Sequence, residues 1–257
     1  MTNQQHPSQL FSSLHVSGNP LVLFNIWDAG TARAVANAGA TAIATGSASV
    51  AGALGYEDGE TVPLAEVIAN LKRIVAAVDL PVTLDFEGGY ARDPKGLAEN
   101  VTKVIAARAA GINFEDQIIG GEGLYEIDEQ CARIAAIRSE VDQSGSGLFI
   151  NARTDIWLPA GAATIDEGER LQAALERVAA YANAGADGFF IPGLADEAAI
   201  ETICRESPLP VNVLMLDGMP GKKRLAELGV ARISHGPGPW KVCMAELNEA
   251  AQSAISG

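Results

Sequence analysis

Two short segments of the sequence place acidic residues directly after runs of apolar residues. In VTLDFEGGY, Asp85 and Glu87 follow such a run, and in GINFEDQ, Glu115 and Asp116 do so. Carboxylates that converge repel one another unless a cation or a shared proton neutralises them. A single acid at such a position can simply cap a helix or pair with an arginine, but four acids in two similar units favour a cation site.

The residue types around these acids indicate which ion they would hold. Neither segment contains a His or a Cys, so the ligands would all be oxygen atoms. Such a set favours Mg²⁺, with Mn²⁺ as the second choice, over zinc. Arg153, in INARTD, complements the acids, because a guanidinium can hold a carboxylate or a phosphate through two hydrogen bonds. Its other interpretation is a salt bridge with one of these acids.

These residues need a scaffold that brings distant segments of the chain to one place. Four segments repeat one pattern, in which an Ala-rich helical stretch ends at a glycine and a short apolar run follows; they begin at Val35, Ala106, Ala180 and Leu225. Extending the pattern predicts strands at residues 22–27, 41–45, 82–85, 112–115, 148–152, 188–191, 211–215 and 231–234. It predicts helices notably at residues 64–78, 96–110, 127–141, 166–184, 197–205 and 222–228.

Eight such units in 257 residues predict an α/β protein with a (β/α)8 barrel, the TIM-type fold, in a single domain over residues 1–257. The apolar runs do not alternate with polar residues, which is typical of parallel strands covered on both faces. A doubly wound open sheet is the alternative, but DAGTAR is not the G-x-G-x-x-G fingerprint of that fold. We expect a polar leader at residues 1–20 and a C-terminal helix at residues 240–257.

In a (β/α)8 barrel the functional groups lie at the C-terminal ends of the strands. Side chains two apart on a strand share a face, and neighbouring strands lie about 4.8 Å apart. We therefore expect Asp85, Glu87 and Glu115 to converge. The other polar positions expected at strand ends are Asp28, Gly46, Ser47, Arg153, Asp155, Asn212 and His235. For His235, in SHGPGPW, the simpler interpretation is that Gly and Pro end the strand and start the last helix.

The overall composition excludes several classes of partner. The chain has 32 acidic and 18 basic residues and a formal net charge of −14, which repels nucleic acids and anionic membrane surfaces. Its three cysteines form no C-x-x-C pair, which argues against a disulfide framework or a thiolate zinc site. The N-terminus lacks the pattern of a secretory signal, and no segment reaches the ~20 apolar residues of a membrane span. We expect a cytoplasmic protein with a small-molecule ligand.

Five motifs together resemble the isocitrate lyase and phosphoenolpyruvate mutase superfamily. They are NIWDAGTARAVANAGATAIATGS, LDFEGGY, GINFEDQ, INARTD and VNVLM, in this order, and the resemblance runs from about residue 21 to about residue 240. It implies a (β/α)8 barrel whose last helix is exchanged with a neighbouring subunit, in a homo-oligomer that is a dimer or, typically, a tetramer. It also implies Mg²⁺ bound together with a small carboxylic acid, namely a 2-oxo acid or its enolate.

The resemblance further implies roles for individual residues. Asp85 would be the direct ligand of the metal, and the other carboxylates would act largely through water. The implied metal positions are Asp85, Glu87 and Glu115. The implied substrate-binding positions are Thr45, Gly46, Ser47, Asp85, Arg153 and Asn212. The candidate catalytic residues are Arg153, Asp58, Glu122 and Tyr90.

The expected lid over the site departs from the better-known relatives. Isocitrate and methylisocitrate lyases carry a Lys-Lys-Cys-Gly-His lid, and the mutases carry a Lys-rich lid, whereas QIIGGEGLY contains no Lys, Cys or His. After the sixth strand, Pro192 stands where the lyases have a Glu and the mutases a His. Glu122, Tyr125 and Tyr90 are the nearby groups that could move a proton.

These features predict a Mg²⁺-dependent lyase that acts on a small 2-oxo or 2-hydroxy acid or diacid by C–C cleavage or decarboxylation. The reaction would pass through a metal-stabilised enolate and release pyruvate or a close analogue. Decarboxylation suits this lid, because carbon dioxide leaves without a protein base. One alternative is a C–P bond mutase or hydrolase of the phosphonopyruvate or carboxyphosphonoenolpyruvate type. Another is a barrel that binds a small acid without turnover.

Overall fold

Eight parallel strands lie side by side in one sheet, in the order β1-β8-β7-β6-β5-β4-β3-β2. The computed structural model describes residues 6–257. The strands are β1 (Leu21–Leu23), β2 (Ile43–Ala44), β3 (Val82–Asp85), β4 (Gly111–Glu115), β5 (Phe149–Arg153), β6 (Gly188–Ile191), β7 (Val211–Leu214) and β8 (Arg232–Ser234). The prediction of a (β/α)8 barrel in a single domain is confirmed.

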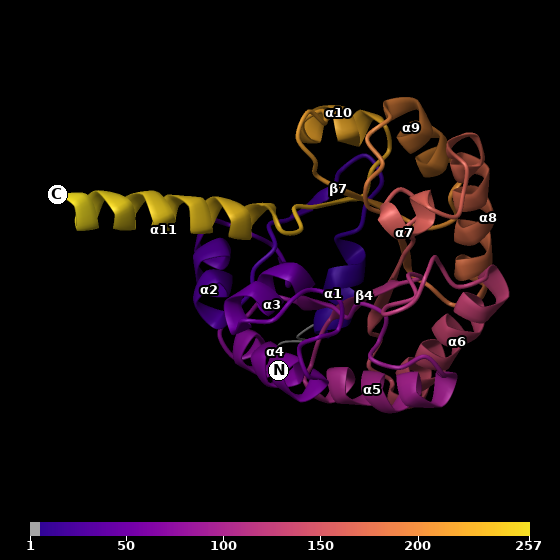
Figure 1. Ribbon diagram of the computed structural model, residues 1–257. Helices are drawn as coiled ribbons and strands as arrows, with labels where there is room; N and C mark the ends of the chain where they lie inside the picture. Colours follow the sequence, from indigo (N-terminus) through magenta and orange to yellow (C-terminus); the bar gives the residue numbers. More distant parts are fainter. Residues whose placement is uncertain (1–5) are drawn as a thin grey trace.

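Helices alternate with the strands and surround the ring (Figure 1). They are α1 (Pro7–Ser13), α2 (Ala29–Asn37), α3 (Ser47–Leu54), α4 (Leu64–Val75), α5 (Pro94–Ala106), α6 (Ile127–Ser144), α7 (Pro159–Ala162), the 3-10 helix η1 (Glu167–Glu169), α8 (Arg170–Asn183), α9 (Glu197–Glu206), α10 (Lys222–Glu227) and α11 (Gly238–Ser256). Two predicted strands, 82–85 and 188–191, match β3 and β6 to the residue. The predicted helix at 166–184 is divided into η1 and α8.

The first strand is shorter than predicted, because the residues after Leu23 serve to close the ring. Asn25 is 3% exposed, and its amide donates to the carbonyl of Thr45 at 2.8 Å. Its Oδ1 accepts the backbone N–H groups of His235 and Gly236 at 3.0 and 2.8 Å. One buried side chain therefore ties the end of β1 to the ends of β2 and β8. Asp28, also expected at this strand end, is exposed and caps α2 by accepting the N–H of Thr31 at 2.7 Å.

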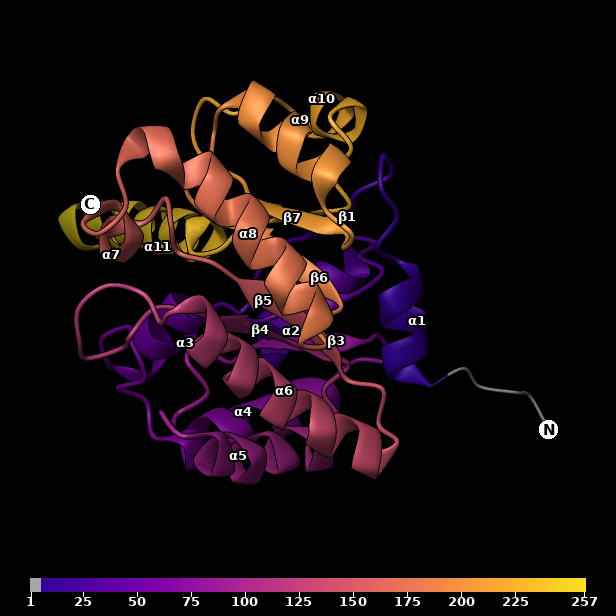
Figure 2. The same cartoon turned by 90° about the vertical axis from the view of Figure 1, so that its right-hand side faces the viewer.

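The segment expected to be a polar leader contains a helix that closes the N-terminal end of the barrel. Phe11 of α1 is fully buried, and its ring meets Phe149 of β5 edge-on at 5.6 Å between centroids. A side chain on Gly111 would collide with this ring, because its Cβ would lie 2.8 Å from Phe11. Figure 2 shows α1 on one side of the ring and α7, which follows β5, on the other. The ligand entrance therefore lies at the end away from α1.

The last helix leaves the barrel instead of packing on it. In Figure 1, α11 runs outward from the ring to the C-terminus. Trp240, in its first turn, still meets Trp27 edge-on at 5.0 Å between centroids. Farther along, Val242, Leu247 and Ile255 are 62%, 62% and 85% exposed. Within residues 6–257, no helix is long and apolar enough to cross a membrane.

We expect the substitution Phe11→Ala to destabilise the barrel by about 3–5 kcal/mol, because it removes a fully buried ring and leaves a cavity at the barrel floor. The control is Leu10→Ala on the same helix, where the side chain is 37% exposed. The free energy of unfolding in urea measures the effect. Equal stability of the two variants would show that α1 is not part of the core.

Candidate active site

Asp85 ends β3 at the open end of the barrel, with one carboxylate oxygen held and the other unpaired. Its Oδ2 accepts the backbone N–H of Ser47 at 3.1 Å, and its own N–H donates to Oγ1 of Thr45 at 2.9 Å. Oδ1 is buried and has no hydrogen-bond partner among residues 6–257. The N–H of Gly46 is also used, since it donates to the carbonyl of Ile26 at 3.2 Å. The segment expected to hold a substrate carboxylate thus holds Asp85.

Glu87 lies two residues beyond Asp85, and both of its oxygens have donors. Oε1 accepts the N–H groups of Gly59 and Glu60 at 3.1 and 2.8 Å, and Oε2 accepts the hydroxyl of Tyr90 at 2.8 Å. Its φ of 51° lies in the left-handed region, which few residues other than glycine adopt. Burial raises the pKa of Glu87 to about 7, with a smaller contribution from the charge of Asp85 and against the hydrogen bond from Glu60.

Glu115, at the end of β4, is paired with Arg153 at the end of β5. The Nη1–Oε2 distance is 2.8 Å, and Arg153 also binds Asp155 through Nε at 2.6 Å and Nη2 at 2.8 Å. Burial raises the pKa of Glu115, an effect that the positive charge of Arg153 opposes. Asp155 is fully buried, so the two acids fix the guanidinium from two sides. Arg153 therefore forms a salt bridge with one of the predicted acids, Glu115, which is the second of its two interpretations from the sequence, and it does so at the mouth of the barrel.

Asp116 is part of the scaffold, although it follows Glu115 directly. It is fully buried, and its Oδ2 accepts the hydroxyl of Tyr181 at 2.8 Å and Nη1 of Arg177 at 3.2 Å. Its Oδ1 accepts the backbone N–H of Asp155 at 2.9 Å. Asp116 therefore links α8 to the loop that carries the partner of Arg153.

The other candidate residues lie at different distances from this centre. Asp58 is exposed at the edge of the mouth, and desolvation there and the charge of Asp85 raise its pKa, against the opposing effects of Ser47 and Arg153. Tyr90 positions Glu87, as described above. Glu122 is exposed on the turn between Gln117 and Leu124, which pair in an antiparallel bridge.

Asn212 lies deeper than the mouth. It is 1% exposed, and its Oδ1 accepts the hydroxyl of Ser234 at 3.2 Å inside the barrel. The structure therefore brings Asp58, Asp85, Glu87, Glu115, Arg153 and Ser47 together and sets Asn212 and Glu122 apart from them.

The chain matches a known family over nearly its whole length. The model of the family described as phosphoenolpyruvate phosphomutase matches residues 11–255. The chain belongs to this family. The resemblance to the isocitrate lyase and phosphoenolpyruvate mutase superfamily is confirmed.

Several known proteins and solved structures are similar to this chain over most of its length. The Uncharacterized protein Rv1998c of Mycobacterium tuberculosis is 35% identical, over 96% of this chain and 89% of its own. The 2-methylisocitrate lyase of Salmonella typhimurium is 29% identical over 80% of this chain and 68% of its own. The oxaloacetate decarboxylase of Pseudomonas entomophila is 29% identical over 88% and 77%. A crystal structure of a candidate phosphonomutase from Burkholderia cenocepacia has 50% identity and a TM-score of 0.92, covering 96% of this chain and all of its own.

Superfamily members generally use a divalent metal ion, and the residues at the mouth fit one ion with a single direct protein ligand. Among residues 6–257, no three His, Cys, Asp or Glu side chains are grouped closely enough to form a metal cluster. The hydrogen bonds above explain this, because the oxygens of Glu87 and one oxygen of Glu115 have donors. The unpaired Oδ1 of Asp85 is the oxygen that a cation would use, and Mg²⁺ characteristically binds one or two carboxylates and several waters.

Three residues of the site escape the sequence patterns. Asp155 appears there only as one of several polar residues after a strand, and nothing local indicates that it locks Arg153. Phe190 of β6 pairs in register with Arg153 and with Asn212, so it faces the barrel interior as they do. Arg232 of β8 is fully buried inside the barrel. Register, which would have identified the last two, is set by contacts between strands.

We expect the stability of the metal-free protein to fall as the pH rises from 4.5 to 7, in part because of Glu87. Its folded pKa of about 7 lies above the ordinary value of 4.5, so over this range the folded state holds a proton that the unfolded state has lost. The contribution is about 3 kcal/mol, and Glu87→Gln should remove it. Urea unfolding at several pH values in a chelating buffer measures it.

The matched control is Glu99→Gln, at an exposed position of α5. Its stability should follow the wild-type curve between pH 4.5 and 7. Parallel curves for Glu87→Gln and the wild type would contradict the burial effect on Glu87.

Proposed function

We propose that the chain is a Mg²⁺-dependent lyase that acts on a small 2-oxo or 2-hydroxy acid or diacid by C–C cleavage or decarboxylation, releasing pyruvate or a close analogue. The unpaired, buried Oδ1 of Asp85, on the same mouth as the fixed guanidinium of Arg153, carries this proposal. A cation would bind Oδ1 of Asp85, and an acid group of the substrate would bind the guanidinium of Arg153. We also propose a cytoplasmic location, which the three free cysteines support.

The residues of the mouth suit these roles. Asp85 would hold the metal ion directly, and Asp58, Glu87 and Glu115 would bind its waters. When bound, such an ion polarises the carbonyl group of the acid and favours the build-up of negative charge beside it. Arg153 uses three N–H groups on Glu115 and Asp155, so two of its five remain for an acid group of the substrate.

The loop over the mouth supports decarboxylation among the lyase reactions. Residues 117–124 form a turn in which the N–H of Ile118 donates to the carbonyl of Gly123 at 3.1 Å. This turn contains no Lys, Cys or His, and Tyr90 is engaged with Glu87. A reaction that releases carbon dioxide needs no protein base at the leaving group. The similarity to an oxaloacetate decarboxylase, at 29% identity, supports the same choice.

A second candidate is C–P bond chemistry, as in a phosphonate mutase or hydrolase. The solved structure at 50% identity is described as a candidate phosphonomutase, and the matching family takes its name from such a reaction. The same mouth would suit it, because a guanidinium holds a phosphonate as readily as a carboxylate.

We expect a panel of 2-oxo and 2-hydroxy diacids, assayed with and without Mg²⁺, to give pyruvate with at least one acid, and chelation to abolish this signal. Asp85→Asn should lower the activity by at least a hundredfold, since it removes the charge that holds the ion but keeps the shape of the side chain. Asp28→Asn, at an exposed helix cap, is the matched control and should be fully active.

The outcomes separate the candidates. Phosphate release from a phosphonate panel, without pyruvate from the diacids, would favour the C–P reaction. Full activity of Asp85→Asn would overturn the metal assignment, and no turnover on either panel would favour a binding role without catalysis.

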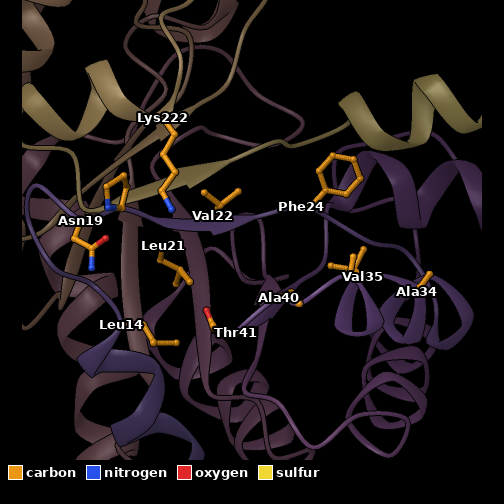
Figure 3. Close-up of a pocket in the computed structure, with 13 residues that line it drawn as sticks. Leu14, Asn19, Leu21, Val22, Phe24, Ala34, Val35, Ala40, Thr41 and Lys222 are labelled. Atoms are coloured by element: carbon orange, nitrogen blue, oxygen red, sulfur yellow. The ribbon is translucent and has the colours of Figure 1, made fainter.

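We further propose that two copies of the chain exchange α11 within a homo-oligomer, a dimer or a tetramer. In this fold a helix follows each strand and covers the sheet, but α11 projects away from β8 (Figure 1). A groove of about 700 Å³ lies instead on the outer side of β1, between α2 and Lys222 of α10 (Figure 3). Leu14, Val22, Phe24 and Val35 line it with apolar atoms.

The pattern of α11 suits that groove. Met244, Leu247, Ala251 and Ile255 recur at helical spacing, so they form one apolar stripe. Leu247 and Ile255 are 62% and 85% exposed, and packing into the groove of a partner subunit would remove these side chains from water.

We expect the wild-type protein to be an oligomer in light scattering coupled to size exclusion. Leu247→Glu combined with Ile255→Glu should shift it toward the monomer, because two charges would enter an apolar contact. Ser253→Glu, exposed on the opposite face of the same helix, should leave the mass unchanged. A monomeric wild type would contradict the exchange.

A further inference from the structure

Arg232 is an arginine fully enclosed in the barrel interior. It is 0% exposed, and its Nη2 donates to Oδ1 of Asn113 at 3.0 Å. Its strand, β8, and the strand of Asn113, β4, lie on opposite sides of the ring, so this bond crosses the interior. Its Nε donates to the hydroxyl of Ser234 at 3.3 Å, and its guanidinium lies 5.9 Å from the ring centroid of Phe11, below.

The charge of Arg232 has no carboxylate partner within 4 Å among residues 6–257; the ion pairs of the described chain involve other arginines. A buried charge without a partner is strongly unfavourable, and barrel interiors are usually filled by Val, Ile and Leu. Burial lowers the pKa of Arg232 to about 9, which still leaves the group charged at neutral pH, and Asp85 acts in the opposite direction. Asn113, which Arg232 binds, pairs in register with Asp85 of the neighbouring strand β3, so the sheet places Asp85 beside the residue that holds this charge.

The groups around Arg232 do not need it for their own hydrogen bonds. Oδ1 of Asn113 also accepts the amide of Asn151 at 2.9 Å, and the hydroxyl of Ser234 also bonds to Asn212 at 3.2 Å. Removing the guanidinium would leave both acceptors with a partner. Replacing buried ionic groups by apolar residues of similar volume is often neutral or stabilising. Packing and hydrogen bonding therefore do not explain this arginine.

The interior between Arg232 and the mouth is also incompletely paired. Five buried polar atoms without a hydrogen-bond partner belong to residues of this region: Thr83 Oγ1, Asp85 Oδ1, Asn151 Oδ1, Asn212 Nδ2 and Arg232 Nη1. These residues are also shielded from solvent, with Asn113, Asn151 and Asn212 at most 4% exposed, and a low-dielectric interior screens a charge weakly, so the field of Arg232 reaches the mouth.

We propose that Arg232 is a specificity-determining residue whose positive charge, held beneath Asp85, strengthens the binding of an anionic acid at the mouth and weakens the binding of the metal ion alone. This inference rests on the proposed function. Its Nη1 is buried, so it acts through the field and does not touch the ligand. Arg153 is paired with Glu115 and Asp155, so the charge of a bound Mg²⁺ is set against Asp58, Asp85 and Glu87. Arg232 adds a further positive charge that favours an anionic acid there.

The test is titration calorimetry of Mg²⁺ without acid, followed by titration of oxalate at saturating Mg²⁺. At an effective dielectric constant near 20, a unit charge about 10 Å away changes the affinity for a doubly charged ion by on the order of a hundredfold. We expect Arg232→Met to bind Mg²⁺ about a hundredfold more tightly and oxalate about a hundredfold more weakly than the wild type. Arg232→Lys should fall between Arg232→Met and the wild type in both titrations, because the same burial lowers the pKa of a lysine toward neutrality and leaves it only partly charged.

A purely structural arginine would behave differently, and Arg133 provides the comparison. It is 1% exposed, lies between the rings of Tyr125 and Phe114, and donates to the carbonyl of Gly88 at 2.6 Å. Arg133→Met should lower the urea midpoint of unfolding without opposite shifts in the two affinities. Arg232→Met should unfold at the wild-type midpoint or above it.

Unchanged affinities in Arg232→Met, or a parallel loss of both, would overturn the inference while leaving the proposed function intact. A wild type that binds neither Mg²⁺ nor oxalate would instead contradict the proposed function. In that case the unfolding midpoint of Arg232→Met still tests whether Arg232 has a structural role. A marked loss of stability would show that the arginine is kept for packing and would overturn the inference.

Discussion

The mouth of this barrel is organised by the repulsion among carboxylates that lie close together in a partly buried place. Each must face N–H groups or a cation, because like charges in a low dielectric are costly to hold together. The structure solves this differently at each position. Asp85 faces the N–H of Ser47, Glu87 faces two N–H groups and a phenol, and Glu115 faces Arg153. Among the carboxylate oxygens of these three acids, Oδ1 of Asp85 is buried and has no hydrogen-bond partner within residues 6–257.

Presenting those donors requires unusual backbone. Glu60, Glu87 and Tyr90 all have positive φ, at 58°, 51° and 58°, in the two loops that surround the carboxylate of Glu87. Such conformations are tolerated where surrounding contacts determine them. Here the contacts are mutual. The N–H of Glu60 donates to the carboxylate of Glu87, and the carboxylate of Glu60 accepts the N–H of Tyr90 at 2.6 Å. The strain therefore marks where the loops are held to serve the site.

The barrel beneath the mouth changes character along its axis. At the floor, an apolar cluster contains Phe11 of α1 with Leu21, Leu23 and Phe149 of the strands. Above it lies a polar layer with Asn113, Asn151, Asn212, Ser234 and Arg232, and the acids come last. The apolar floor excludes water from below. Charges in the layers above it are therefore screened weakly, which is why a buried arginine can influence the mouth without touching it.

The sequence by itself determined the fold and the neighbourhood of the site. Glycines after Ala-rich helices and apolar runs without alternation are local signals, and the ends of parallel strands must meet on one side of the sheet. That was enough to place Asp85, Glu87, Glu115 and Arg153 together. Tertiary structure alone decided that Glu115 faces the mouth while Asp116 is bonded into α8, and that α1 is the floor. It also decided that Arg232 reaches Asn113, which is 119 positions away. The physical reason is that sequence periodicity reports neighbours along one element, whereas register, hydrogen-bond partners and burial depend on segments that meet only after the chain has folded.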